Sequence, residues 1–292
     1  MDTNANNNRE SFEDQQVIFV DTHLIQKAVE GLQRAREEFQ TLLEQAEGGD
    51  ASVYYDLGVR YTEGDGTDKD PAQAARWFAL ASEDGDLRAT DLLGRCYQSG
   101  AGVEKDEARA AECYLQAAEQ DYAPAQTNLA VCLLNGTGAE RSAEEAVGWL
   151  EKAVEQEFPR AQGILGDLLL TGNGVPEDKA RAVKLYRQAA EQGSSVGQCN
   201  LGYCMLKGIG IRPDPAQAVY WFRKAAEGGS GRAMCLLGDC YREGQGVEAD
   251  AAQARTCYQK AIDLGFDAKE ELEELDKAAP AGAAEQPKKK KS

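Results

Sequence analysis

The residues best suited to chemistry in this sequence are eight cysteines and a single histidine. Cys199 and Cys204 are five residues apart, and Cys235 and Cys240 have the same separation. On a helix, this separation turns the second side chain about 140° away from the first, so one helix cannot direct both thiols at one metal ion. The spacing argues against a zinc site, and we expect neither a metal nor a cofactor.

Nucleophilic and phosphate chemistry are equally poorly supported. No repeat unit combines a serine, a histidine and an acidic residue. We interpret the single histidine, His23, as a surface residue near the start of a helix. Recurring Gly-x-Gly pairs could suggest a phosphate-binding loop, but no strand precedes them and no Gly-Lys-Ser/Thr follows. We therefore expect no catalytic residues and a protein that is not an enzyme.

Charge and composition restrict the class of partner. The net charge of −18 disfavours nucleic acid, whose phosphates are bound by excess Lys and Arg. The longest early apolar run, Val17-Ile18-Phe19-Val20, follows an acidic segment and is far shorter than the ~18 residues of a membrane span. Eight cysteines in 292 residues are also too sparse for a small secreted disulfide scaffold. We expect a cytoplasmic protein without a signal peptide or membrane span.

A 36-residue period runs through residues 50–265 without gaps. The six copies are residues 50–85, 86–121, 122–157, 158–193, 194–229 and 230–265. A leucine followed by glycine, or by alanine in the third copy, recurs at Leu57, Leu93, Leu129, Leu165, Leu201 and Leu237. A Gly-x-Gly turn then precedes an Asp or Ser able to cap a second helix, at Asp70, Asp106, Ser142, Asp178, Asp214 and Asp250. Each copy therefore predicts a helical hairpin.

Small residues in the repeat have a packing role. In the second predicted helix, three positions recur at helical spacing: an alanine, then an aromatic residue or a leucine, then another alanine. Ala110, Tyr114 and Ala117 are one example. The glycine of the first helix would let this stripe approach closely, with the large side chain filling the gap. One hairpin is too small to bury a core alone, so neighbouring hairpins must stack.

The second copy carries the pattern most completely: Ala89, Leu93-Gly94, Tyr97, Gly100 to Val103, Asp106, Ala110, Tyr114 and Ala117. This pattern resembles the Sel-one-like repeat of the tetratricopeptide-repeat superfamily. The resemblance implies an all-α, right-handed solenoid of six hairpins with capping helices at both ends. It also implies a scaffold or adaptor that binds a protein partner.

The sequence outside the repeats predicts two caps and two tails. Residues 22–49 indicate one long or two short helices, with Leu32, Phe39, Leu42 and Ala46 covering the first repeat. Residues 266–278 predict an acidic capping helix. Residues 1–21 and the Ala/Pro/Lys-rich residues 279–292 are expected to be disordered. The Lys288–Lys291 tail is either a simple solvated tail or a signal for nuclear import or anionic membranes.

Two cysteine pairs occupy facing columns of the hairpins, Cys96 with Cys113 and Cys240 with Cys257. In other copies tryptophan replaces the second cysteine, which favours packing, although oxidation of these pairs stays open. The resemblance also includes a secreted, cysteine-rich branch with one disulfide per unit. Here Ala226 and Ile262 stand where the partner cysteine belongs. A secreted or periplasmic protein with a cell-envelope or host-interaction role is the alternative function.

The resemblance implies that first helices line the concave face and that five of their columns meet the ligand. One column, two residues before the leucine, contains Thr127 and Cys199. Another is apolar only in its middle copies, at Leu134, Leu170 and Leu206. With Val131 and Tyr203, these leucines form a candidate central apolar strip, unless they pack against neighbouring hairpins instead.

Charges in these five columns are nearly balanced, which is unusual in so acidic a chain. The basic residues are Arg88, Arg95, Arg160, Lys207, Arg232 and Arg242, and the acidic ones are Glu63, Asp91, Asp167, Asp239 and Glu243. This enrichment in arginine favours an extended peptide that carries carboxylates. By resemblance, the amides of Asn128 and Asn200 would hold the ligand backbone. The predicted binding residues are Arg88, Arg95, Asn128, Val131, Leu134, Arg160, Asp167, Leu170, Asn200, Tyr203 and Leu206.

Overall fold

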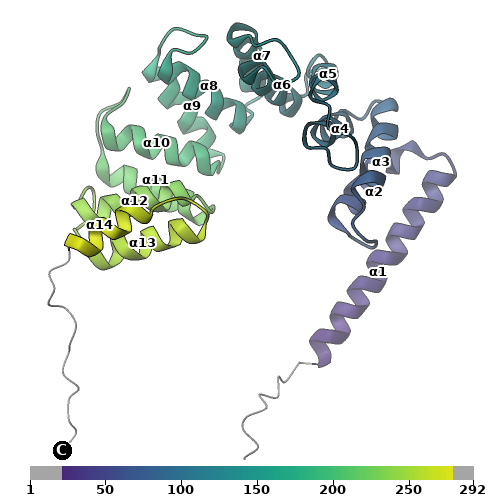
Figure 1. The fold of residues 1–292 in the computed structure, drawn as a ribbon, viewed down its shortest axis with the longest axis horizontal. Helices are drawn as coiled ribbons and strands as arrows, with labels where there is room; N and C mark the ends of the chain where they lie inside the picture. Colours follow the sequence, from purple (N-terminus) through teal and green to yellow (C-terminus); the bar gives the residue numbers. More distant parts are fainter. Residues whose placement is uncertain (1–21, 279–292) are drawn as a thin grey trace, which may run out of the picture.

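The structure, a computed structural model, describes residues 22–278. All regular elements in that range are helical: fourteen α-helices and one short 3-10 helix, η1 (Ala51–Val53). The helices form stacked hairpins along an arch (Figure 1). This confirms the predicted all-α solenoid. The disorder predicted for residues 1–21 and 279–292, and the Lys288–Lys291 tail, lie outside the described residues.

Each unit contributes two helices. The first helices are α2 (Tyr54–Glu63), α4 (Leu87–Ser99), α6 (Ala123–Asn135), α8 (Pro159–Thr171), α10 (Ser195–Lys207) and α12 (Gly231–Glu243). The second helices are α3 (Pro71–Glu83), α5 (Glu107–Ala118), α7 (Ala143–Glu155), α9 (Lys179–Glu191), α11 (Pro215–Glu227) and α13 (Ala251–Asp263). The stack is preceded by α1 (Thr22–Glu47) and followed by α14 (Lys269–Ala278).

The predicted helix boundaries are confirmed by their capping geometry. Each of the six Asp or Ser residues accepts a hydrogen bond from a first-turn amide of its second helix, as Asp106 does from the amide of Arg109 at 3.0 Å. The first glycine of every Gly-x-Gly turn ends the first helix with a positive φ, for example 75° at Gly100. Local capping therefore sets where each first helix ends and where each second helix begins.

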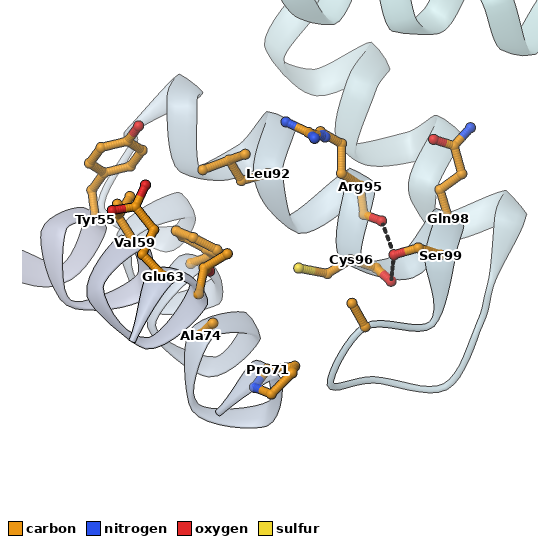
Figure 2. A pocket seen from close by; sticks show the side chains of 13 residues that line it. Tyr55, Val59, Glu63, Pro71, Ala74, Leu92, Arg95, Cys96, Gln98 and Ser99 are labelled. Atoms are coloured by element: carbon orange, nitrogen blue, oxygen red, sulfur yellow. Dashed lines mark hydrogen bonds between the residues drawn. The ribbon is translucent and has the colours of Figure 1, made fainter. Parts of the chain in front are cut away.

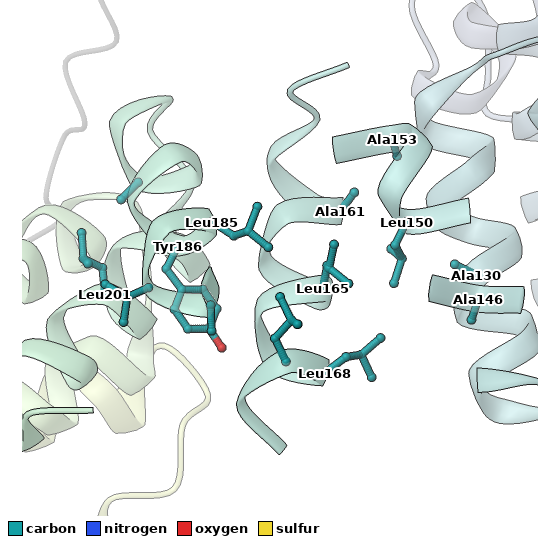
Figure 3. Close-up of a cluster of buried hydrophobic side chains, with 14 of the residues drawn as sticks. Ala130, Ala146, Leu150, Ala153, Ala161, Leu165, Leu168, Leu185, Tyr186 and Leu201 are labelled. Carbon is teal, nitrogen blue, oxygen red and sulfur yellow. The ribbon is translucent and has the colours of Figure 1, made fainter. Parts of the chain in front are cut away.

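Close packing between the two helices of a unit follows the predicted small-to-large pattern. A Cβ on Gly94 would lie 2.7 Å from a ring carbon of Tyr114, so this position has no room for a side chain. In the third unit Ala130 and Leu150 replace glycine and the aromatic residue, and both are fully buried (Figure 3). The large side chain of the second helix therefore fills the space beside a small residue of the first.

The N-terminal cap differs in part from the expectation. α1 is one continuous helix whose second half packs on the first unit through Phe39 and Ala46, which are 3% and 8% exposed. The prediction that Leu32 covers this unit is wrong, because its side chain is 64% exposed. The helix is longer than the surface below it, and its first half extends past the stack (Figure 1). At the other end, Leu275 of α14 is buried against α13, as expected for a cap.

The second glycine of each turn is expected to be the more sensitive one. Gly136 and Gly138 both have positive φ, 71° and 70°, so alanine at either site should cost ~1–2 kcal/mol of stability. A Cβ on Gly138 would also overlap the backbone carbonyl of Glu107, whereas the nearest atom to a Cβ on Gly136 is 3.4 Å away. Urea denaturation should show Gly138→Ala to be less stable than Gly136→Ala by a further ~1 kcal/mol. Equal losses would mean that contact between units does not require this glycine.

Candidate partner-binding face

In the N-terminal half of the arch the first helices lie on its inner side (Figure 1), and the surface that the first helices form along the stack is called the inner face below. In Figure 1, α2, α4 and α6 are nearer the inside of the curve than α3, α5 and α7. Four predicted binding residues are exposed: Arg88, Arg95, Arg160 and Asp167. Six are half-buried: Asn128, Val131, Leu134, Leu170, Tyr203 and Leu206. Four apolar members of this second group, all except Val131, also pack against the main core, so the strip is only partly open to solvent.

One of the five predicted ligand-facing columns is wrong. The column two residues before the leucine is buried in five of the six units: Asp91, Thr127, Gly163, Cys199 and Cys235. At 3.6 residues per turn, this position is rotated towards the neighbouring hairpin rather than towards the inner surface. Of this column only Tyr55, in the first unit, is partly accessible.

A first polar network joins three units across the inner face. The side-chain nitrogen of Asn128 donates a 2.7 Å hydrogen bond to Asp91, and its oxygen accepts a 2.6 Å bond from Arg160. Both ends of the Asn128 amide are therefore used within the protein. Burial raises the pKa of Asp91, and the Asn128 bond opposes this shift. The network fixes the position of the exposed Arg160 guanidinium.

A second network repeats this arrangement two units further on. Asn200 donates to Asp167 at 3.1 Å and accepts from Arg232 at 2.9 Å. The hydroxyl of Tyr186 also donates to Asp167, at 2.6 Å. The buried Asn200 is thus a structural link, and not the free amide that the resemblance implied. A sequence signal for this existed, because Arg160 and Arg232, like Asn128 and Asn200, are two 36-residue units apart.

Three exposed arginines remain available on this face. Among residues 22–278, no ion pair of 4.0 Å or less involves Arg95, Arg160 or Arg232. In contrast, Arg88 pairs with Asp86 at 2.6 Å while its guanidinium stacks 4.0 Å from the centroid of the Tyr55 ring. Arg95 and Arg160 do act electrostatically on Asp91, and acidic residues nearly balance the basic ones in the predicted columns. The face is therefore close to neutral in a chain of net charge −18.

The inner face also contains a cavity of about 640 Å³ between the first unit and α4. Tyr55, Val59 and Phe78 line it from the first unit, and Arg95 and Cys96 line it from α4. Figure 2 shows the Cys96 thiol pointing towards this space from α4. The cavity lies at the N-terminal end of the face, away from the predicted central strip. It offers apolar surface beside one exposed guanidinium.

The cysteines of the described chain are all unpaired, including Cys96, Cys113, Cys240 and Cys257. Burial raises the pKa of Cys96, and it raises that of Cys113 to about 11. Such thiols stay protonated at neutral pH and are poor nucleophiles and metal ligands. Within residues 22–278, no group of three or more His, Cys, Asp or Glu side chains is arranged to hold a metal ion. None of the described helices is long and apolar enough to cross a membrane.

The Asn128 network makes a testable contribution to stability. Asn128→Ala removes the donor to the buried Asp91 carboxylate, which should lower the free energy of unfolding by ~1–3 kcal/mol near pH 7. The pKa of Asp91, already raised, should rise further. A carboxyl whose pKa is higher in the folded than in the unfolded state disfavours folding when ionised, so the loss should shrink as the pH falls and Asp91 becomes protonated.

Urea denaturation near pH 7 and near pH 4, with an NMR titration of Asp91, would measure both effects. Asn135→Ala is the matched control, because Asn135 is an exposed residue on the same helix. Equal stability of the two variants, or a loss that does not depend on pH, would contradict the role assigned to the network.

Comparison with solved structures supports the fold. The chain is 35% identical to a protective antigen of uropathogenic Escherichia coli described as having an SLR fold, with a TM-score of 0.72 over 85% of this chain and 53% of that one. It is 29% identical to a Sel1 repeat protein from Oxalobacter formigenes, with a TM-score of 0.72 over 83% and 97%. An immunity protein of Pseudomonas aeruginosa shares the fold at 19% identity, with a TM-score of 0.51 over 79% and 88%. The 53% coverage of the E. coli antigen means that this chain spans about half the length of that protein.

The repeat itself identifies the family. No curated protein matches the sequence. The sequence model of the Sel1 repeat matches six consecutive segments, residues 51–86, 88–122, 123–158, 159–194, 195–230 and 231–266. Proteins built from Sel1 repeats generally mediate protein–protein interactions. With matched repeats across most of its length and the corresponding stacked hairpins, this chain belongs to the Sel1 repeat family.

Proposed function

We propose that this protein is a non-enzymatic scaffold that holds an extended peptide or protein segment carrying carboxylates on its concave face. The observation that carries the proposal is the set of exposed arginines that make no ion pair of 4.0 Å or less within the described residues, Arg95, Arg160 and Arg232. Arg160 and Arg232 are each held by an asparagine of the preceding first helix. Guanidinium groups fixed in advance lose little freedom on binding a carboxylate, which favours affinity.

Apolar contacts would supply the rest of the binding energy. The cavity beside Arg95 has room for a large apolar side chain against Tyr55, Val59 and Phe78. Leu170, in the predicted central strip, is half-buried and leaves part of its side chain accessible. A peptide with apolar residues between acidic ones would match both features of this face.

The experiment is affinity purification of the partner, followed by calorimetry with the minimal binding segment. Replacing the aspartates and glutamates of that segment by asparagine and glutamine should weaken binding and reduce its dependence on salt. If the segment with its acidic residues replaced binds as tightly as the original at every salt concentration, the arginines have no role in binding it. Partner mapping to the second helices would exclude the concave face.

We further propose that the protein works in the cytoplasm. The support is the set of unpaired cysteines and the raised pKa of thiols such as Cys113. The alternative is a secreted or periplasmic protein with a cell-envelope or host-interaction role, and the similarity to an E. coli protein described as a protective antigen favours it. Thiol counting on freshly isolated, denatured protein separates the two. Eight reactive thiols would support the cytoplasm, whereas bridged pairs would support the alternative.

A further inference from the structure

One position near the start of the first helices is an arginine in every second unit. Arg88, Arg160 and Arg232 are each the second residue of their helix, α4, α8 or α12, and are separated by two repeat units. In the unit between Arg160 and Arg232 the same position is Val196, whose side chain is 61% exposed. A two-unit period therefore places one guanidinium group on each side of an accessible apolar side chain.

The asparagines of the inner face follow the same two-unit period, and each holds the arginine of the next unit. Asn128 accepts a 2.6 Å hydrogen bond from Arg160, and Asn200 accepts a 2.9 Å bond from Arg232. The nitrogen of each amide is bonded to an aspartate of the unit before. Arg160 and Arg232 are thus held in equivalent ways. Each uses one of its five N–H groups in this bond and is exposed, so donors are left for a ligand.

The first arginine of the series shows what such a guanidinium binds. Arg88 pairs at 2.6 Å with the carboxylate of Asp86, two residues before it. At the other two arginines, the residue two positions earlier is Phe158 or Ser230, and neither has a carboxylate. A carboxylate that the chain itself supplies to Arg88 is therefore missing at the later two arginines, where a ligand can supply it.

The distance between these two arginines limits which ligand can reach both. Hydrogen bonds through Asn200 join α8 to α10 and α10 to α12. Neighbouring packed helices lie at most about 10 Å apart, so the two arginines are separated by roughly 20 Å. Six residues of an extended strand cover about 20 Å, and their alternation returns the side chain at i+6 to the side of residue i. A polyproline II segment, with three residues per turn and about 3.1 Å per residue, does the same.

We propose that Arg160 and Arg232 bind two carboxylates of one extended partner segment, located at positions i and i+6. Each carboxylate takes the place that Asp86 takes at Arg88, and the uncharged residues between them cross Val196. This inference rests on the proposed function, because it specifies the acidic segment that the concave face holds.

An NMR titration of the full chain with synthetic peptides tests this spacing. The probes are capped peptides of equal length and composition, each with two glutamates in an uncharged background, spaced i+3, i+5, i+6 or i+9. At low ionic strength the i+6 peptide should bind about threefold tighter than the others, because only its second glutamate reaches a second arginine. It should shift the side-chain Nε–H signals of both Arg160 and Arg232.

Two variants identify the residues responsible. Arg160→Gln and Arg232→Gln should each reduce the affinity for the i+6 peptide to that for the i+3 peptide, and their thermal melts should stay close to wild type because both side chains are exposed. Arg76→Gln is the matched control, since Arg76 is an exposed residue on α3, a second helix. It should leave every affinity unchanged.

Three results would overturn the inference: equal affinities at all spacings, no binding at roughly 5 mM peptide, or a preference for i+6 that survives both arginine variants. If the natural partner segment still depends on its acidic residues in any of these cases, the spacing is wrong and the scaffold proposal stands. Failure of the proposed function is a different observation, since the partner then maps to the second helices.

Discussion

Leu165→Ala is expected to lower the free energy of unfolding by ~2–5 kcal/mol, the range for a leucine removed from a tightly packed interior. Leu165 is completely buried on α8, in the middle of the stack. Figure 3 shows it between Leu150 of the preceding unit and Tyr186 of its own. Both neighbours sit on rigid helices and are also fully or almost fully buried, so the surroundings cannot collapse freely into the space left behind.

Urea denaturation with linear extrapolation measures this loss, with Leu115→Ala as the matched control. Leu115 lies on α5 and is 40% exposed, so its loss should stay within about 0.5 kcal/mol, as for other surface substitutions. A loss at Leu165 as small as that of the control would mean that the leucine column does not form the interior of the stack, and that the repeat register is wrong.

The parts of the fold that were predictable from sequence are those determined by local chemistry. Asp106 caps a helix through its own side chain, and Gly100 ends one through its own φ, so neither depends on distant contacts. Recurrence at a 36-residue period then identified each signal six times over. The stacking of hairpins followed because a single unit cannot bury the large side chain opposite its glycine.

The orientation of the inner columns was only partly predictable. A helix face is defined by a rotation of about 100° per residue, and a small error in that rotation moves a column from the surface into the stack. Thr127 and Cys199 were expected to face a ligand for this reason, and both are buried. Leu32 shows the opposite error. It belongs to an apolar stripe, but the first unit, which it was expected to cover, does not reach as far along α1 as Leu32.

The polar networks were missed because they join residues from three successive units. Asp91, Asn128 and Arg160 each look like a separate ligand-facing residue when only their own unit is considered. Their hydrogen bonds arise only when neighbouring hairpins are placed side by side. Burial of the Asp91 carboxylate then makes its partner necessary, since an ionised group without a hydrogen bond would cost several kcal/mol in such a site. The same stacking that creates the network also presents Arg160 to the inner surface.

Leu170→Glu is expected to weaken partner binding by ~2–4 kcal/mol, the loss seen when a central apolar anchor is removed, while leaving the fold intact. Leu170 lies on α8 and is half-buried, so a glutamate there can turn its carboxylate towards water without entering the interior around Leu165. On the bound partner, however, the same carboxylate would meet apolar and acidic groups. Circular dichroism and a thermal melt would check the fold, and calorimetry with the purified partner segment would measure the affinity.

Two further variants give this experiment its reference points. Arg95→Glu should reduce affinity less than Leu170→Glu and should make binding less sensitive to salt, because an exposed charge at the edge of a site mainly steers association. Arg187→Glu changes a residue of α9, a second helix, and should leave affinity unchanged. If Leu170→Glu and Arg95→Glu both bind normally while Arg187→Glu does not, the partner lies on the second helices. The arginines of the inner face would then have no role in its recognition.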